Sequence, residues 1–236
     1  VVESLQFNGK FKDIKAYSLI NGKDIKSDKE IDIKSPHSSS VLGKKYFADE
    51  KISETAIESL KEYSSKWKKF PIEKKVEIFL KFSNLIEDNT NDIIEICAKE
   101  SGKSIKNSIA EIREAIDFCR YYSKEALNLF QTQTLKGPTG ELNQYRMVGK
   151  GLSFVVSPWN FPVAIFIGQT VAALITGNVV ITKPAEQSSF AAYYIIKLLL
   201  KAGLPSNAIA LLLGDGALIG KKVINDKKLK NVIFTG

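Results

Sequence analysis

Residues 152–182, LSFVVSPWNFPVAIFIGQTVAALITGNVVIT, decide the fold of this chain. The short apolar run 152–156 predicts a buried strand. Two prolines follow, and the long apolar segment 161–176 then predicts a helix. A second apolar run, 178–182, predicts another strand. A strand, a helix and a strand of these lengths are typical of a right-handed βαβ unit, whose two strands run parallel.

The same alternation continues to residue 234. Helices are expected at 188–202 and 216–224, and strands at 208–213 and 231–234. The expected strands begin 23 to 30 residues apart, at positions 152, 178, 208 and 231, which is the rhythm of repeated βαβ units. We therefore expect an α/β fold, with a Rossmann-like parallel sheet covered by helices on both faces.

Ligands of such sheets bind at the carboxyl ends of the strands. The expected strands of this chain all end in segments rich in polar residues and glycine. These segments are Ser157-Pro158-Trp159-Asn160, Lys183-Pro184-Ala185-Glu186, Gly214-Asp215-Gly216 and Thr235-Gly236. This edge is the first place to look for a binding site.

The residues before this core predict a helical layer. Apolar residues recur every three or four positions in 53–67, from Pro71 to about residue 86, and from about 104 to 126. Ser53 is expected to cap the first of these helices and Pro71 to open the second. A polar, glycine-punctuated segment follows and predicts an extended β arm or hairpin. The expected organisation is an N-terminal layer, 1–133, an oligomerisation-type arm, 134–150, and a Rossmann-like core, 151–236.

Composition excludes several classes of function. The net charge is +8, but nearly all the basic residues are scattered lysines, the exceptions being Arg113, Arg120 and Arg146. Nucleic-acid readers favour clustered arginines and aromatic platforms, so no nucleic-acid partner is expected. The longest apolar run is too short to span a membrane, and no secretion signal is expected. Two cysteines in helical patterns fit a reducing compartment, so we expect a cytoplasmic protein with no membrane partner and no metal site.

The tetrad Ser101-Gly102-Lys103-Ser104 resembles the end of a phosphate-binding P-loop. That motif needs a glycine five residues before Gly102, and this position holds Cys97. The motif also follows a strand, whereas a helix is expected here. The tetrad is therefore interpreted as the end of one helix and the start of the next.

Two motifs at the sheet edge leave alternatives open. Gly214-Asp215-Gly216 and the later Gly220 follow a strand and open a helix, but their spacing is one residue too long for G-x-G-x-x-G. They form either a pyrophosphate cradle or a tight turn. Lys183 and Glu186 could grip the hydroxyl groups of a ribose, or they could form a solvated charged turn.

Asn160 lies between two aromatic residues and two prolines. A rigidly held amide donor suits a developing oxyanion, where it lowers the barrier by about 3–4 kcal/mol. The alternative is an ordinary turn between a strand and a helix, with Pro162 at the first helical position. Composition cannot decide between the two.

The motifs Pro158-Trp159-Asn160-Phe161-Pro162, Gly177-Asn178 and Lys183-Pro184-Ala185-Glu186 resemble the NAD(P)-dependent aldehyde dehydrogenase superfamily, in order and in spacing. Phe234-Thr235-Gly236 resembles the start of that family's F-T-G-S segment. The segments 113–122, 137–141 and 185–187 are similar to the pyrroline-5-carboxylate (glutamate semialdehyde) dehydrogenase branch. They are most similar to that module of the bifunctional bacterial proline-utilisation enzymes.

The resemblance implies a role for each motif. Asn160 would be the oxyanion donor, and Glu114 and Phe161 would line the aldehyde pocket, where a carboxylate can meet the substrate's ammonium group. Segment 134–150 would be the oligomerisation arm. The residues expected to bind the cofactor NAD are Ser157, Pro158, Trp159, Lys183, Pro184, Glu186, Gly214, Gly216, Thr235 and Gly236.

The family mechanism also needs a cysteine nucleophile and a glutamate base. In the family both follow the F-T-G-S segment, and Cys97 and Cys119 lie well before Asn160 without family motifs around them. The chain is therefore expected to be the cofactor-binding half of a dehydrogenase, inactive alone and weak in NAD binding. A separate catalytic half, a non-catalytic remnant or interaction module, a homo-oligomer and a different aldehyde substrate all remain open.

Overall fold

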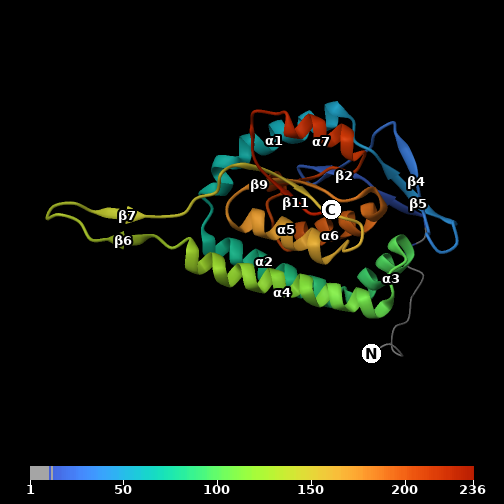
Figure 1. The fold of residues 1–236 in the computed structure, drawn as a ribbon, viewed down its shortest axis with the longest axis horizontal. Helices are drawn as coiled ribbons and strands as arrows, with labels where there is room; N and C mark the ends of the chain where they lie inside the picture. Colours follow the sequence, from blue (N-terminus) through green and yellow to red (C-terminus); the bar gives the residue numbers. More distant parts are fainter. Residues whose placement is uncertain (1–10, 12) are drawn as a thin grey trace.

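The computed structural model describes Phe11 and residues 13–236, and the first residues of the predicted N-terminal layer, 1–10 and 12, lie outside the described residues (Figure 1). A six-stranded sheet forms the centre. Four of its strands are parallel neighbours, which confirms the predicted core. Two short antiparallel strands extend one edge, and the sequence did not predict this extension. In spatial order the strands are β11 (Leu229–Phe234), β8 (Leu152–Val156), β9 (Val179–Lys183), β10 (Ile209–Leu211), β2 (Ser18–Ile20) and β3 (Lys23–Ile25).

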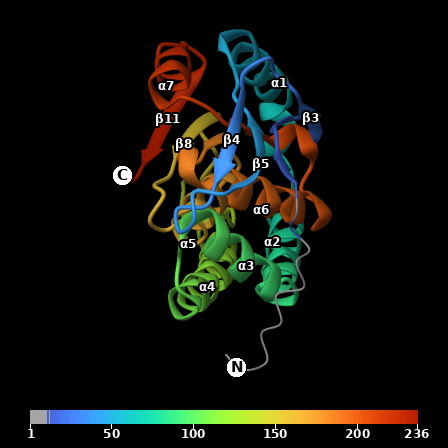
Figure 2. The same ribbon diagram turned by 90° about the vertical axis from the view of Figure 1, so that its right-hand side faces the viewer.

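Helices cover both faces of the sheet (Figure 2). On one face, α5 (Ala164–Ile175) connects β8 to β9, and α6 (Ser189–Lys201) leads from β9 to β10. On the other face, α1 (Glu50–Lys68) packs beside α7 (Gly216–Ile224). This arrangement confirms the predicted Rossmann-like fold with helices on both faces.

A further layer of helices lies outside α5 and α6 (Figure 1). It consists of α2 (Ile72–Asp88), α3 (Thr90–Ser101) and α4 (Ile105–Leu129). Helix α4 packs along α5, and a Cβ atom at Gly168 of α5 would lie 2.8 Å from the Phe118 ring of α4. Because α5 is enclosed between the sheet and α4, it is apolar on nearly all sides.

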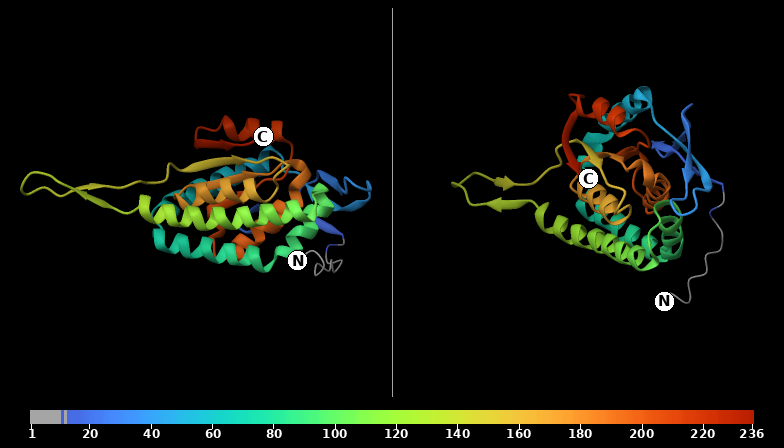
Figure 3. Two further views of the ribbon diagram at one scale, coloured as in Figure 1. Left: turned by 60° about the horizontal axis from the view of Figure 1, so that its bottom comes forward. Right: turned by 45° about the vertical axis from the view of Figure 1, so that its right-hand side comes forward.

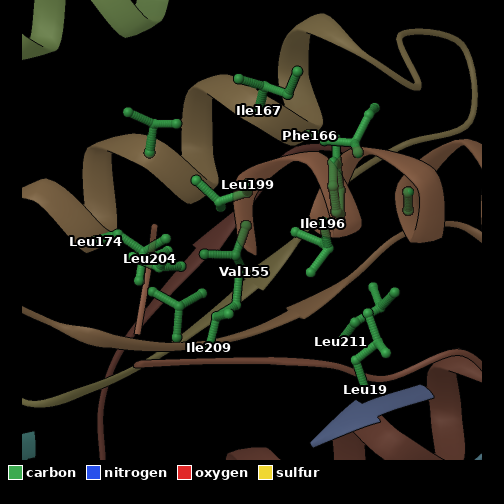
Figure 4. Close-up of a cluster of buried hydrophobic side chains, with 14 of the residues drawn as sticks. Leu19, Val155, Phe166, Ile167, Leu174, Ile196, Leu199, Leu204, Ile209 and Leu211 are labelled. Atoms are coloured by element: carbon green, nitrogen blue, oxygen red, sulfur yellow. The ribbon is translucent and has the colours of Figure 1, made fainter. Parts of the chain in front are cut away.

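The core fills the space between the sheet and α5 and α6 (Figure 4). Every residue of β9 is buried, which explains why its sequence is a continuous apolar run. Full burial of one Leu, Ile or Phe side chain contributes about 1.5–3 kcal/mol. The buried side chains labelled in the close-up are Leu19, Val155, Phe166, Ile167, Leu174, Ile196, Leu199, Leu204, Ile209 and Leu211.

Some element boundaries differ from the sequence prediction. The helix expected from Phe161 begins at Ala164, because a residue that precedes a proline is disfavoured in helical conformation. Ser53 is not the cap of α1. Asp49 caps that helix and accepts the N–H of Ile52 at 2.7 Å, whereas Ser53 is buried in the first turn. For α3, the sequence analysis predicted the end of a helix before Gly102 but not the residue at which the helix begins.

The segment expected to be extended forms a two-stranded hairpin that projects from the body (Figure 3). Strands β6 (Gln133–Leu135) and β7 (Asn143–Tyr145) pair antiparallel, and almost all of their residues are exposed. A separate three-stranded sheet near the N-terminus contains β1 (Ile14–Ala16), β5 (Val41–Tyr46) and β4 (Glu30–Lys34). Among the helices that the structure describes, none is both long enough and apolar enough to cross a membrane.

Candidate functional site

The order of the parallel strands reverses between β8 and β11. The chain runs from β8 outward through β9 to β10, and then crosses to β11 on the other side of β8. In sheets of this type a ligand binds in the crevice at this reversal. The segments that follow the two strands meet there, since the N–H of Thr235 donates to the carbonyl oxygen of Val156 at 3.1 Å. The Gln169 side chain of α5 also donates to the Thr235 hydroxyl.

The turn after β8 presents Asn160 at this edge. Asn160 is exposed, as are its neighbours Trp159 at 58% and Phe161 at 40%. Ser157 is buried at the start of the turn, and its hydroxyl has no hydrogen-bond partner among the described residues. The Asn160 amide therefore lies between two large aromatic side chains that are both exposed.

Two residues that the sequence analysis did not select hold this turn. Glu111 of α4 is 2% exposed, and its Oε2 accepts the N–H groups of Val163 at 3.0 Å and Ala164 at 3.2 Å. The carboxylate therefore caps the positive N-terminal end of α5. Lys103 pairs with the other oxygen of Glu111 and donates to the carbonyl oxygen of Asn160 at 2.5 Å.

The two predicted substrate residues lie next to this pair. The Lys103 ammonium group lies 4.6 Å from the centre of the Phe161 ring, a cation–π distance. Glu114 is exposed one helical turn after Glu111 on α4. The structure therefore brings Phe161 and Glu114 to the same region as Asn160.

Three predicted cofactor residues converge at the ends of β9 and β10. Lys183 is 4% exposed, and its Nζ lies 3.3 Å from Oε1 of Glu186 and 3.1 Å from the carbonyl oxygen of Pro184. The same Glu186 oxygen accepts the N–H of Gly216, the first residue of α7, at 3.0 Å. A Cβ atom at Gly216 would lie 3.7 Å from both charged groups. Lysine, glutamate and a helix N-terminus thus form one cluster.

Gly214 has a different position from Gly216. It is buried with a φ of +152°, and a Cβ atom there would lie 2.9 Å from Ile219 and 3.3 Å from the backbone nitrogen of Ala48. Asp215 accepts the N–H of Leu218 at 2.9 Å, and this hydrogen bond lowers the pKa of its carboxyl group. Of the two alternatives for this motif, a pyrophosphate cradle or a tight turn, the geometry at Gly214 and Asp215 fits the tight turn. Gly216, by contrast, faces the charged cluster of Lys183 and Glu186.

A second buried glutamate lies beside the site. Glu100 accepts the N–H groups of Phe190 at 2.8 Å and Ala191 at 2.9 Å, and so caps α6. Burial raises the pKa of Glu100 to about 7. Glu100 and Trp159 line a cavity of about 460 Å³ together with Asp32, Ile33, Lys34, Pro36, Lys45, Ser101 and Gln187.

Neither cysteine is placed to act at this edge. Cys97 and Cys119 are fully buried in α3 and α4. Burial raises the pKa of each thiol to about 12, so neither forms a thiolate at neutral pH.

A model of the aldehyde dehydrogenase family matches residues 24–236. The 1-pyrroline-5-carboxylate dehydrogenase of Bacillus subtilis (strain 168) is 34% identical over 219 residues, which are 92% of this chain and 42% of that protein. Two solved structures are also similar. One is proline utilization A (PutA) from Bdellovibrio bacteriovorus, inactivated by N-propargylglycine, with a TM-score of 0.91 and 33% identity. The matched region covers 95% of this chain and 24% of the PutA chain. The other is 1-pyrroline-5-carboxylate dehydrogenase from Thermus with bound NAD, with a TM-score of 0.90 and 28% identity. The matched region covers 95% of this chain and 44% of the Thermus chain.

This chain spans less than half the length of each of these relatives. The matched family and the similar structures confirm the resemblance that the sequence motifs predicted. The chain belongs to the aldehyde dehydrogenase family.

Proposed function

We propose that this chain is the cofactor-binding part of an NAD-dependent dehydrogenase that oxidises glutamate 5-semialdehyde, the open form of 1-pyrroline-5-carboxylate, to glutamate. Relatives that carry the name 1-pyrroline-5-carboxylate dehydrogenase support the substrate class. The observation that carries the proposal is the convergence at one sheet edge of Asn160, the Lys183–Glu186 pair and the N-terminus of α7.

The residues at this edge fit NAD. Lys183 and Glu186 offer a donor and an acceptor side by side, which suits the neighbouring hydroxyl groups of a ribose. The buried hydroxyl of Ser157 has no partner in the described part of the chain and is free to bind a ligand. The exposed Trp159 ring adds an apolar surface for the nicotinamide side. NAD, when bound, supplies the hydride acceptor of the reaction.

Asn160 would stabilise the reacting aldehyde. Its side-chain amide would donate a hydrogen bond to the aldehyde oxygen as negative charge develops there, which lowers the barrier by about 3–4 kcal/mol. The nucleophile would be a cysteine thiolate supplied from outside these 236 residues, because both thiols of this chain are buried and protonated.

Glu114 and Phe161 would recognise the substrate. The exposed Glu114 carboxylate suits the ammonium group of glutamate semialdehyde, and the Phe161 ring suits its carbon chain. If the substrate were an aldehyde without an ammonium group, removal of the Glu114 charge would leave the turnover of that aldehyde unchanged.

Two exposed apolar surfaces indicate where partners of this part of the dehydrogenase would bind. The arm exposes Leu135, Leu142 and Tyr145, which favours a homo-oligomer built through the arm. Strand β11 lies at an open edge of the sheet and exposes Val232 and Phe234, which favours contact with a catalytic half. A non-catalytic interaction module would use the same two surfaces.

The cofactor proposal is tested by saturation-transfer NMR with NAD and the 236-residue chain. We expect weak binding that Lys183→Met reduces further, because this substitution removes the buried ammonium group. Lys197→Met is the matched control, since Lys197 is a partly exposed lysine of α6 that pairs with Asp24. Absence of transfer to NAD, or equal loss in both variants, would contradict the proposal.

Activity is tested with and without a catalytic half. The chain alone should form no NADH from 1-pyrroline-5-carboxylate, because it lacks an ionisable thiol at the site. In an enzyme reconstituted with the remaining portion of the Bacillus subtilis relative, Asn160→Ala should lower kcat by about a hundredfold or more and change NAD affinity little. Equal losses of kcat and NAD affinity would indicate that Asn160 has a structural role.

A further inference from the structure

The tetrad Ser101-Gly102-Lys103-Ser104 forms a sharp junction between two helices. Gly102 ends α3 in the left-handed conformation, with φ of +64°. The Ser104 hydroxyl then accepts the N–H of Asn107 at 3.3 Å and caps α4. From this junction the Lys103 side chain reaches Glu111 of α4 and the turn after β8.

Lys103 makes three contacts around that turn. Its ammonium group pairs with Glu111, donates to the carbonyl oxygen of Asn160 at 2.5 Å, and lies 4.6 Å from the centre of the Phe161 ring. The Lys103 side chain is mostly buried, with 13% exposed. The ion pair with Glu111 is therefore shielded from solvent more than a surface ion pair would be.

Glu111 fixes the far end of the same turn. It accepts two backbone N–H groups, those of Val163 and Ala164, where α5 begins. The first end of the turn is fixed by the sheet, since the N–H of Ser157 donates to the carbonyl oxygen of Lys183 at 3.2 Å. Between these two ends, Lys103 holds the backbone of Asn160, while the Asn160 side chain remains exposed.

We propose that Lys103 and Glu111 are positioning residues, which fix the backbone of residues 157–163 so that the Asn160 amide projects from the sheet edge in one direction. The catalytic meaning of this direction rests on the proposed function, but the positioning itself does not. An amide that serves as an oxyanion donor must be held in place before the reaction begins.

A neighbouring ion pair provides the matched control. Glu95 of α3 is buried like Glu111, and it pairs with Lys99 at 2.5 Å. Lys99 donates hydrogen bonds to Glu95 and to the carbonyl oxygen of Phe11, and neither partner belongs to residues 157–163. Glu95→Gln therefore removes a comparable buried charge without touching the turn.

The test uses the 236-residue chain labelled with 5-fluorotryptophan and needs neither nucleotide nor substrate. Its two tryptophans give separate fluorine NMR signals, of which Trp159 lies in the turn and the fully buried Trp67 serves as an internal reference. Glu111→Gln and Lys103→Met should each shift or split the Trp159 signal and leave the Trp67 signal in place. Lys103→Arg, which keeps the charge, should restore the original signal.

Hydrogen exchange provides a second measurement. In Glu111→Gln, the amide protons of Val163 and Ala164 should exchange about tenfold faster relative to that of Val180 in β9, because they lose a charged acceptor. If Glu111→Gln does not fold, Lys103→Met still tests the proposal, because it leaves the cap of α5 intact.

An unchanged Trp159 signal in folded Lys103→Met and Glu111→Gln would overturn the proposal. The same change in Glu95→Gln would also overturn it, because that outcome would show a general loosening of the helical layer. Absence of NAD binding to the unchanged chain, together with a Trp159 signal that moves in Lys103→Met and Glu111→Gln, would count against the proposed function and would leave the positioning proposal standing.

Discussion

Glu100 and Glu111 occupy comparable positions and have different electrostatic partners. Each is a buried glutamate of the outer helical layer, and each accepts two backbone N–H groups at the start of a core helix. Glu111 pairs with Lys103. Lys45, a cation close to Glu100, donates its hydrogen bond to the carbonyl oxygen of Glu186 instead.

The comparison shows that two buried glutamates that cap helices in the same way can differ in electrostatics, depending on whether a lysine pairs with the carboxylate. A buried carboxylate is costly unless a positive charge and hydrogen bonds compensate for its lost hydration. The Lys103 ammonium group gives that compensation to Glu111. Glu100 has mainly the two N–H groups and the helix dipole, so burial raises its pKa to about 7. The cap without a directly paired cation, Glu100, should therefore titrate.

The largest effect is expected when the paired cap is broken. Glu111→Ala should lower the free energy of unfolding by about 3–5 kcal/mol, because it removes the anionic partner of the mostly buried Lys103 ammonium group and the acceptor of two N–H groups. Urea denaturation measures this loss.

The double variant Lys103→Met with Glu111→Leu separates the charge from the cap. It should lose less than Glu111→Ala alone, since no unpaired charge remains buried. If both variants lost the same free energy, the ion pair would contribute nothing, and the contrast between the two glutamates would disappear.

A smaller effect is expected at the unpaired cap, and it depends on pH. The folded state raises the pKa of Glu100 from an ordinary 4.5 to about 7, so it binds the proton more tightly than the unfolded chain does. The associated stability is present below the unfolded pKa and is lost as the pH rises through the folded one. The loss is at most about 3 kcal/mol.

Glu100→Gln should flatten this dependence. Urea denaturation on the acidic and the alkaline side of the interval between 4.5 and about 7 compares the variant with the unchanged chain. A slope that stays the same in Glu100→Gln would show that another group titrates in this range.

These two glutamates also mark the limit of prediction from the sequence. The parallel strands and the edge that gathers Asn160, Lys183 and Gly216 were predicted, because the apolar rhythm of residues 152–234 fixes where each strand ends. The Lys183–Glu186 pair was also accessible, because its members are three residues apart in the sequence.

The caps could not be predicted in this way. Glu111 lies 52 residues before the N–H group of Val163 that it caps, and Glu100 lies 90 residues before that of Phe190. No local pattern marks such a pair, since its members meet through the packing of α3 and α4 against the core. Asp49, by contrast, caps α1 from the adjacent position, and an acidic residue directly before a helix is a signal that the sequence does contain.

The smallest effect is expected at an exposed cap, Asp215, which accepts the N–H of Leu218 at the start of α7. Asp215→Ala should lower the free energy of unfolding by less than either buried glutamate variant, because water can solvate the N–H group that loses its acceptor. Asp215→Asn keeps a capping oxygen and should lose less, which urea denaturation without nucleotide can measure. A loss at Asp215 as large as that of Glu111→Ala would mean that burial and pairing do not determine the strength of a cap, and the contrast between Glu100 and Glu111 would then need a different cause.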